Sequence, residues 1–218
     1  MTRRSGRSER LTAAARRAQL VEVGRAVFAK HGFEATSVEE IAKRAKVSKP
    51  IVYEHFGGKE GLYAVVVDRE VEHIVARIVE ALSSGSARER LEQAALAFLV
   101  YIEERPDGFA VLLRDAPASK RTGEMPALMY DLADRVGDVF AEQFRNAGFD
   151  IKAAPIYAHA LVGMVAFVGQ WWVETRKPPP AETVASHIAA LAWMGLRHLP
   201  KRPAPVATAR ARQTASPT

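Results

Sequence analysis

The stretch from residue 37 to residue 59 holds the side chains of this chain that are best suited to bind a polyanion. Hydroxyl, imidazole and cationic groups hold phosphate oxygens, and arginine or lysine can also donate hydrogen bonds to the edge of guanine. The candidate contact residues are Ser37, Arg44, Lys46, Ser48, Lys49, Pro50, Tyr53, His55 and Lys59. Their types and spacing predict a nucleic-acid-binding surface.

Two short helices must position these side chains. Ser37 and Glu40 have the S-x-x-E spacing of a capping box, which predicts a helix over residues 38–45. Ser48 can cap a second helix over residues 48–56, whose first turn tolerates a proline. The two helices, joined by a turn at residues 46 and 47, form a helix-turn-helix that leaves exposed a polar face narrow enough for the DNA major groove.

This pair is too small to fold alone, so a preceding helix must cover it. An apolar stripe at Leu20, Val23 and Val27 predicts that helix, and Gly32 is suited to the left-handed conformation that ends it. The predicted core residues of the pair are Ile41, Ala42, Val47, Val52 and Phe56, packed against Val27 and Phe28.

The run from Arg16 to Tyr63 resembles the DNA-binding domain of the TetR family of bacterial transcription regulators. The matching residues are Ala26-Val27-Phe28, His31-Gly32-Phe33, Thr36-Ser37-Val38, Ile41-Ala42, Val47-Ser48-Lys49, Tyr53-Glu54-His55-Phe56 and Lys59-Glu60-Gly61-Leu62. This combination is a far stronger signal than a helix-turn-helix alone. The rest of the chain is similar to the family only in length and helical pattern.

The resemblance implies that Tyr53 and Lys59 contact phosphates, with His55 as a further contact. Lys59 opens a long helix, whose free N–H groups also favour anions. Ser37 and Ser48 are implied to cap their helices and to share in phosphate contacts. The alternative is that both serines are caps and nothing more.

Contacts to base edges are implied for Arg44, Lys49 and Pro50. Arg44 can form two hydrogen bonds to guanine, and Pro50 can touch a thymine methyl group. The alternative is that both cations are solvated surface groups. The arginines within residues 1–11 either enter the minor groove or attract DNA without regard to sequence.

Lys46 departs from the family pattern, which usually has glycine in this turn. The position is typically left-handed, so lysine costs about 1 kcal/mol relative to glycine. It also brings a cation to the expected DNA surface.

The remaining chain also reads as helical, and no segment alternates with period two, so the predicted fold class is all-α. Further helices are predicted over residues 59–82, 88–104, 108–114, 126–147, 154–176 and 181–199. The predicted organisation is a flexible basic arm (1–11), a helix-turn-helix domain (12–60), a larger helical ligand-binding and dimerisation domain (61–199) and a disordered basic tail (200–218).

The resemblance further implies a homodimer, formed through Ala154–Arg176 and Ala181–Leu199, that binds an inverted-repeat operator. It also implies a small apolar ligand in the larger domain. The candidate lining residues are Phe98, Phe109, Met129, Tyr130, Met164, Phe167, Trp171 and Trp172. The alternative is that these side chains form core, because pockets and cores share composition. The loop over residues 116–124 is either a pocket entrance or a plain loop.

Residues 154–173 are long and apolar enough to suggest a membrane span. In a membrane, however, His159 and Gln170 would lie in hydrocarbon, and two glycines weaken the helix. A buried helix in a dimer accounts for the same composition, and no membrane partner is predicted.

Composition argues against several other classes of protein. The chain of 218 residues has no cysteine, which removes disulfides, thiol nucleophiles and cysteine zinc sites. It has no G-x-S-x-G motif, no phosphate-binding glycine loop and no i, i+4 histidine pair, so no enzyme, metal site or cofactor is predicted. The first 19 residues contain only one large apolar side chain, which argues against a secretory signal and favours the cytoplasm.

The charge is unevenly placed along the chain. Residues 1–59 hold 13 Lys and Arg against 6 Asp and Glu, whereas residues 60–218 hold 18 against 19. A basic front end on a near-neutral body points to a polyanion bound by the front end. The predicted function is a sequence-specific DNA-binding transcriptional regulator, which the resemblance makes a ligand-responsive repressor. The alternatives are a sequence-indifferent, nucleoid-type DNA binder and a membrane-associated adaptor.

Overall fold

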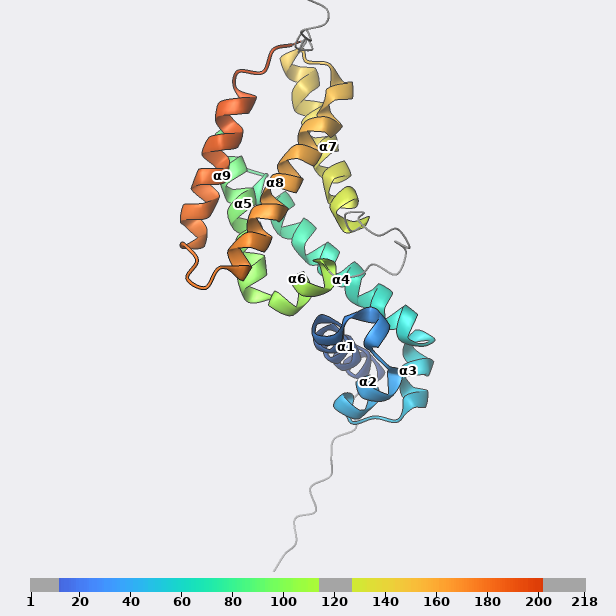
Figure 1. Ribbon diagram of the computed structural model, residues 1–218. Coiled ribbons are helices and arrows are strands. Elements are labelled where there is room, and N and C mark those ends of the chain that lie inside the picture. The colour runs from blue at the N-terminus through green and yellow to red at the C-terminus, as the bar shows by residue number, and fades with distance from the viewer. Residues whose placement is uncertain (1–11, 114–126, 202–218) are drawn as a thin grey trace, which may run out of the picture.

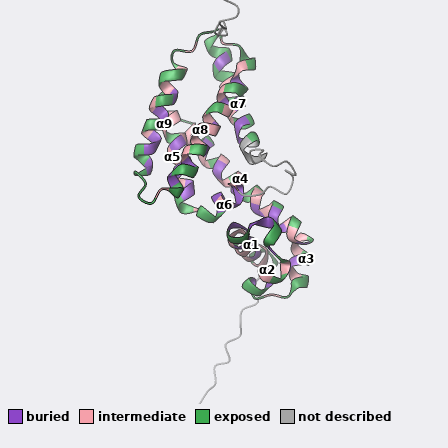
Figure 2. Ribbon diagram, in the orientation of Figure 1, coloured by how far each residue is buried: buried purple, intermediate pink, exposed green. Residues whose placement is uncertain are grey.

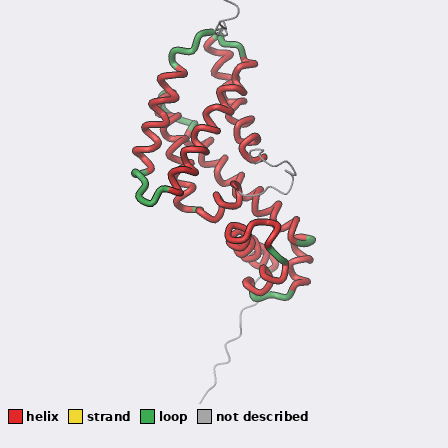
Figure 3. Tube along the Cα trace, in the orientation of Figure 1, coloured by secondary structure: helices red, strands yellow, loops and turns green. Residues whose placement is uncertain are grey.

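The computed structural model describes residues 12–113 and 127–201, and the regular structure within these ranges is entirely helical (Figures 1 and 3). The elements are α1 (Ala13–Ala35), α2 (Val38–Ala45), α3 (Lys49–Phe56), α4 (Lys59–Ala81), α5 (Ala87–Glu104), α6 (Pro106–Leu113), α7 (Ala127–Ala147), a 3-10 turn (Ile151–Ala153), α8 (Ala154–Glu174) and α9 (Ala181–Leu196). The predicted fold class is confirmed. The predicted basic arm, the loop over 116–124 and residues 202–218 of the predicted tail lie outside the described residues.

Helices α1, α2 and α3 form a small domain, which lies at the lower end of the molecule in Figure 1. Its buried core includes Leu20, Val27, Phe28, Ile41, Ala42, Val52 and Leu62, with Val47 and Phe56 partly buried against it. The core predicted from the sequence is therefore confirmed. The start of α4 adds a further wall, where the Tyr63 ring meets those of Phe28 and Phe33 edge-on at 5.0 and 4.9 Å.

The helical path of α1 breaks at Gly32, as predicted. Gly32 has a φ of 76°, a left-handed conformation that glycine adopts without steric cost. Its carbonyl oxygen accepts a hydrogen bond of 2.6 Å from the buried hydroxyl of Thr36. The chain thereby turns out of α1 and into α2.

Helix α4 runs through both domains. Leu62 and Val66 belong to the core of the small domain, whereas Ile74 and Ile78 belong to the core of the large one. The boundary predicted after residue 60 therefore falls within a continuous helix.

The large domain consists of α5 to α9 with the second half of α4. Helix α7 lies along α8, and α5 lies along α9 (Figure 1). Their buried faces point inward and their exposed faces outward (Figure 2). Helices α8 and α9 end two and three residues earlier than predicted. Helix α8 stops at Glu174, ahead of three consecutive prolines that cannot continue it, and α9 stops at Leu196, after Gly195 in its last turn.

The segment Ile151–Glu174 is long and apolar enough to cross a membrane, judged by length and composition only. In the single chain, its side chains Ile156, Phe167 and Trp171 are exposed. On the neighbouring α9, Leu191 and Met194 are exposed as well. These exposed side chains of α8 and α9 are called the apolar outer surface below.

Candidate nucleic-acid interface and effector cavity

The start of α2 is capped from one side only. The Ser37 hydroxyl oxygen accepts a hydrogen bond of 3.2 Å from the Glu40 backbone N–H, as predicted. The Glu40 carboxylate does not complete the capping box, because it lies 2.9 Å from a guanidinium nitrogen of Arg44 and 3.3 Å from the ring of His31. Glu40 thus orients Arg44 instead.

Lys46 adopts the left-handed conformation that the sequence predicts for this turn, with φ 56° and ψ 45°. Among the described residues it is the one non-glycine residue with positive φ. The turn is closed by a hydrogen bond of 3.0 Å from the Val47 N–H to the Ala42 carbonyl. The Lys46 side chain is exposed beside the start of α3.

Ser48 precedes α3, but its side chain makes no capping hydrogen bond, so that part of the prediction is wrong. An N-cap side chain accepts from the second or third helical N–H. The second residue here is Pro50, which has no N–H. The third is Ile51, whose N–H donates to the Ser48 carbonyl at 3.1 Å. The Ser48 hydroxyl therefore remains available on the surface.

Helix α3 presents a polar outer face. Lys49, Pro50 and Tyr53 are exposed, Tyr53 with 54% of its surface accessible, whereas Val52 is buried in the core. His55 is half-buried beside the Phe56 ring. The helix that the sequence predicts to enter a DNA groove is thus held by one apolar face and open on the other.

The two cations predicted to reach base edges are held by carboxylates of α2. Lys49 pairs with Glu39, and Arg44 pairs with Glu40. Exposed ion pairs of this kind contribute little to stability. A nucleic acid that offers phosphate or base acceptors can therefore displace them at small cost.

Lys59 has a structural contact that the sequence did not reveal. Its ammonium donates a hydrogen bond of 3.0 Å to the Phe33 carbonyl and a weaker one of 3.4 Å to the Glu34 carbonyl. It also lies 4.3 Å from the centroid of the Phe33 ring, within range of a cation–π contact. Lys59 therefore joins the start of α4 to the end of α1.

The large domain contains a cavity of about 440 Å³ that is partly open to solvent, within the size range of small-molecule sites. Its walls come from the end of α4, α5 as far as Phe98, α7 from Leu132 onward, the middle of α8 and the second half of α9. Most of these segments lie in the part of the large domain furthest from α3 (Figure 1). The cavity is thus remote from the candidate nucleic-acid surface.

The aromatic and methionine residues predicted to line a pocket are scattered. Phe98 lines the cavity. The described lining does not include the others: Phe109 and Trp172 are buried in core, Met164 is partly buried against it, and Tyr130, Phe167 and Trp171 are exposed. The side chain of Met129 lies outside the described residues. The lining residues that the sequence did not single out include Leu91, Val136, Phe140, Phe144, Val165 and Trp193.

Two arginines border this otherwise apolar cavity. Arg90, on α5, is half-buried, and Arg197, which follows α9, is exposed. Neither makes an ion pair with another residue of the described ranges. The cavity therefore combines an apolar interior with two bordering arginines that form no ion pair within residues 12–113 and 127–201. Within residues 12–113 and 127–201, no three His, Asp or Glu side chains gather to hold a metal ion.

Comparison with known proteins identifies relatives of both domains. A family model described as bacterial regulatory proteins of the tetR family matches residues 20–66, and one described as a tetracyclin repressor-like C-terminal domain matches residues 77–207. The chain is 29% identical over 197 residues to the HTH-type transcriptional activator FasR of Mycolicibacterium smegmatis, covering 89% of each chain.

Two further matches agree with this result. The HTH-type transcriptional repressor Rv3405c of Mycobacterium tuberculosis is 32% identical over 77 residues, which is 35% of this chain and 39% of that one. A crystal structure of a TetR-like transcriptional regulator from Rhodococcus sp. RHA1 superimposes with a TM-score of 0.70 at 27% identity, covering 87% of this chain and all of that one.

Proposed function

Because the chain belongs to the TetR family of bacterial regulatory proteins and is a DNA-binding transcriptional regulator, we propose that it represses transcription as a homodimer on an inverted-repeat operator. We propose that a small amphipathic anion in the cavity releases it. The observation that carries the proposal is the exposed polar face of α3, with Lys49, Pro50 and Tyr53, on a helix anchored from its other side by Val52.

In the proposed complex, α3 lies in the major groove. The Tyr53 hydroxyl and the Lys59 ammonium contact backbone phosphates, as do the hydroxyls of Ser37 and Ser48 and the His55 ring. The exposure of Tyr53, Ser37 and Ser48 supports this arrangement.

Sequence is read by Arg44, Lys49 and Pro50 in this proposal. Arg44 and Lys49 exchange their carboxylate partners on α2 for base edges, while Pro50 meets a thymine methyl group. Lys46 adds a phosphate contact from the turn. The solvent-exposed position of all four side chains supports these roles.

The second copy is proposed to cover the apolar outer surface of α8 and α9. Exposed side chains of this size usually mark an interface. A membrane is the other environment that favours them, but α9 has only 16 residues, fewer than the roughly 20 that span a bilayer. The surface shared by a long and a short helix therefore favours a protein partner. In the dimer, two copies of α3 about 34–36 Å apart reach successive major grooves.

The proposed effector has an apolar body and an anionic head. The cavity wall is mostly aliphatic and aromatic, while Arg90 and Arg197 offer unpaired charge at its border. A carboxylate pairs with arginine through two parallel hydrogen bonds, which fixes the head while the chain fills the interior. Palmitate is a suitable probe, and decanol tests whether the charge is needed.

Binding of palmitate can be measured by calorimetry on the wild-type protein and on Arg90→Gln and Arg197→Gln. We expect each variant to bind palmitate at least fivefold more weakly, and decanol no more weakly than the wild type does. An equal loss for both probes would mean that the arginines shape the cavity but bind no anion. Tight binding of decanol with no binding of palmitate would reverse the proposed ligand class.

The proposed direction of regulation is repression of transcription. The relatives include a named activator, FasR, and a named repressor, Rv3405c. Repression is proposed here because a bound dimer excludes RNA polymerase by occupancy alone, whereas activation needs an additional contact with the polymerase. We propose a cytoplasmic location on the same ground, because the operator is part of the chromosome.

The test is recovery of bound DNA fragments across the genome, followed by binding of the recovered fragment and a scrambled copy at several salt concentrations. We expect an inverted repeat within the fragment and an affinity for it at least 10³-fold above that for the scrambled DNA. A ratio near one at every salt concentration would instead indicate a sequence-indifferent DNA binder.

A further inference from the structure

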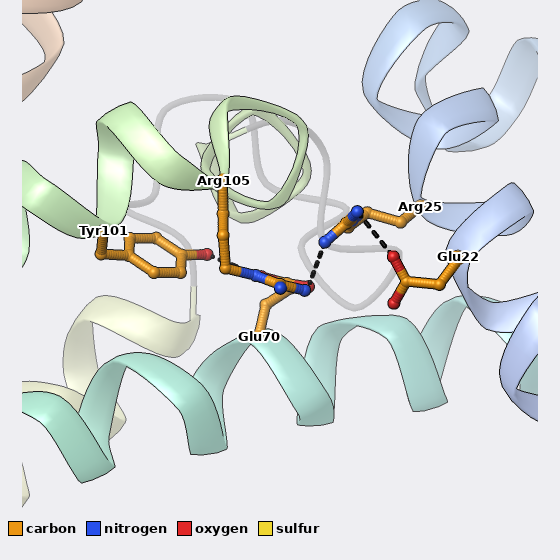
Figure 4. A network of polar contacts seen from close by, with 5 residues as sticks. All are labelled: Glu22, Arg25, Glu70, Tyr101 and Arg105. Atoms are coloured by element: carbon orange, nitrogen blue, oxygen red, sulfur yellow. Dashed lines mark hydrogen bonds and ion pairs between the residues drawn. The ribbon is translucent and has the colours of Figure 1, made fainter.

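Glu70 lies on α4 at the junction of the two domains, between Val66 of one core and Ile74 of the other. Its side chain is 3% exposed. Its two carboxylate oxygens accept hydrogen bonds from Arg105 at 2.6 and 2.9 Å, and from the Tyr101 hydroxyl at 3.0 Å. Arg25 of α1 donates a further one at 3.4 Å (Figure 4). A single buried carboxylate therefore joins the small domain to the large one.

The charges of this network are fixed near neutral pH. Burial raises the pKa of Glu70, but the hydrogen bonds and charge of Arg105, aided by Tyr101 and Arg25, lower it to a net value below its ordinary 4.5. Burial and the neighbouring carboxylate raise the pKa of the Tyr101 hydroxyl. Glu70 is thus an anion and Tyr101 a neutral donor.

The contacts on the two sides of Glu70 are unequal. Arg105 and Tyr101, both from the large domain, hold the carboxylate by short hydrogen bonds, whereas Arg25 approaches only to 3.4 Å. Arg25 has a second carboxylate at 2.6 Å, that of Glu22 one turn earlier on its own helix. If Arg25 moves away, both Arg25 and Glu70 therefore keep a charged partner. This ion pair between α1 and α4 can open without stranding a buried charge, while the apolar contact of α1 with Val111 of α6 remains.

The network is in contact with the wall of the cavity. The Phe98 ring lines the cavity and meets the Phe109 ring of α6 edge-on at 5.8 Å. The preceding residue, Gly108, lies so close to Glu70 that a Cβ atom there would be 2.2 Å from a carboxylate oxygen. Helix α6 is thus pressed between a cavity-lining side chain and the junction carboxylate. Through Phe109, the Phe98 ring therefore packs against the same helix whose backbone at Gly108 contacts Glu70.

We propose that Glu70 is the positioning residue that sets the orientation of the DNA-binding domain on the large domain, and that its ion pair with Arg25 opens when the cavity fills. The orienting role of Glu70 rests on its hydrogen bonds to residues of both domains. The opening of the ion pair rests on the proposed function, because it assigns to an effector the displacement of Phe98. The occupied and empty states then differ in the freedom of the small domain to rotate against the large domain.

The test uses the absence of cysteine in the chain, which allows site-specific spin labels. Cysteines are introduced at Lys30 on α1 and Glu142 on α7, both exposed, and the labelled chain is diluted in unlabelled protein. The label–label distance distribution is measured without DNA or ligand. We expect one narrow distribution in the parent protein and a distribution at least twice as wide in Arg25→Gln and Glu70→Gln.

Glu104→Gln is the matched control, because Glu104 also joins α5 to α4 through an ion pair, with Arg77, but lies exposed and outside the network. Its distribution should superimpose on that of the parent. Distributions for Arg25→Gln that match the parent would overturn the proposal. Loss of cooperative unfolding in Arg25→Gln would also overturn it, because the ion pair would then support the fold and not the orientation.

The link to the cavity is tested with palmitate as the probe and the recovered operator as the DNA. In the wild type, palmitate should weaken operator binding by at least tenfold, a coupling of ordinary size. In Arg25→Gln, palmitate should bind with unchanged affinity but weaken operator binding less than threefold. Full coupling in this variant would refute the link. If palmitate does not bind the wild type, the proposed ligand class is wrong. The role of Glu70 in domain orientation is still decided by the spin-label distances, which are measured without ligand.

Discussion

The ammonium nitrogen of Lys59 lies 3.0 Å from the carbonyl oxygen of Phe33 and 4.3 Å from the centre of its ring. The first residue of α4 is thereby tied to the end of α1, where helix carbonyls lack partners within the helix. Lys59 consequently supports the small domain, besides the phosphate contact proposed for it.

Replacing Lys59 should therefore affect stability and DNA binding together. Lys59→Ala is expected to lower the free energy of unfolding by about 1 kcal/mol, the usual contribution of one hydrogen bond, and to weaken binding to all DNA sequences alike. Tyr53→Phe is the comparison, because Tyr53 is exposed and bonded to no core group; it should weaken DNA binding without changing the melting temperature. Thermal unfolding and anisotropy with operator and scrambled DNA check both. Altered site preference in either variant would contradict the phosphate roles.

The two base-reading cations should each govern one operator position. Arg44→Ala and Lys49→Ala are each expected to lower the binding free energy for the preferred base by about 1–3 kcal/mol. Selectivity at that operator position should therefore relax. Glu39→Gln is the control for Lys49, since it removes the carboxylate partner of Lys49 but leaves the cation in place, and it should keep the wild-type preference. The measurement is selection from a randomised operator library. Unchanged preference in both alanine variants would exclude them from base reading.

The left-handed turn at Lys46 should be strained. Lys46→Gly is expected to raise the free energy of unfolding by about 1 kcal/mol, because glycine adopts φ 56° without the Cβ clash. The higher conformational entropy of glycine in the unfolded chain offsets part of this gain. Lys46→Ala removes the same charge but keeps the Cβ atom, so it should show no gain. Denaturant unfolding of the three proteins measures the difference. Equal stability of the glycine and alanine variants would show that the turn carries no strain.

The pKa of Glu70 gives stability a defined dependence on pH. Because the folded protein lowers this pKa below 4.5, the carboxylate contributes stability that is complete above about pH 4.5 and is lost as the pH falls through the lowered value. Glu70→Gln lacks this titration, so the stability difference between wild type and variant should shrink on acidification below pH 4.5. Chemical unfolding at pH 7, 5, 4 and 3 measures it. A difference that grows on acidification would contradict the lowered pKa.

The sequence predicted what depends on local pattern. Apolar spacing gave the helices, and the capping signals at Ser37 and Gly32 placed ends that the structure bears out. The predicted capping hydrogen bond of Ser48 does not form, because Pro50 lacks the N–H group that would donate it. The proline is visible in the sequence, but the capping motif does not take it into account.

What the sequence could not predict depends on contacts between distant residues. The wall of the cavity is set by which face of each helix turns inward, so of the aromatic candidates only Phe98 lies there, while Phe167 and Trp171 face outward. Likewise, the meeting of Glu70 with Arg25 and Arg105 joins residues 45 and 35 positions apart, for which no spacing rule exists.

The most direct measurement of the central claim is a hydroxyl-radical footprint of the protein on its recovered operator. A dimer that places two copies of α3 in successive major grooves should protect two patches on each strand, related by a two-fold axis and centred about 10–10.5 base pairs apart. Their separation should not change with salt as long as the protein stays bound. Protection in a single patch, or evenly along the fragment, would contradict the account.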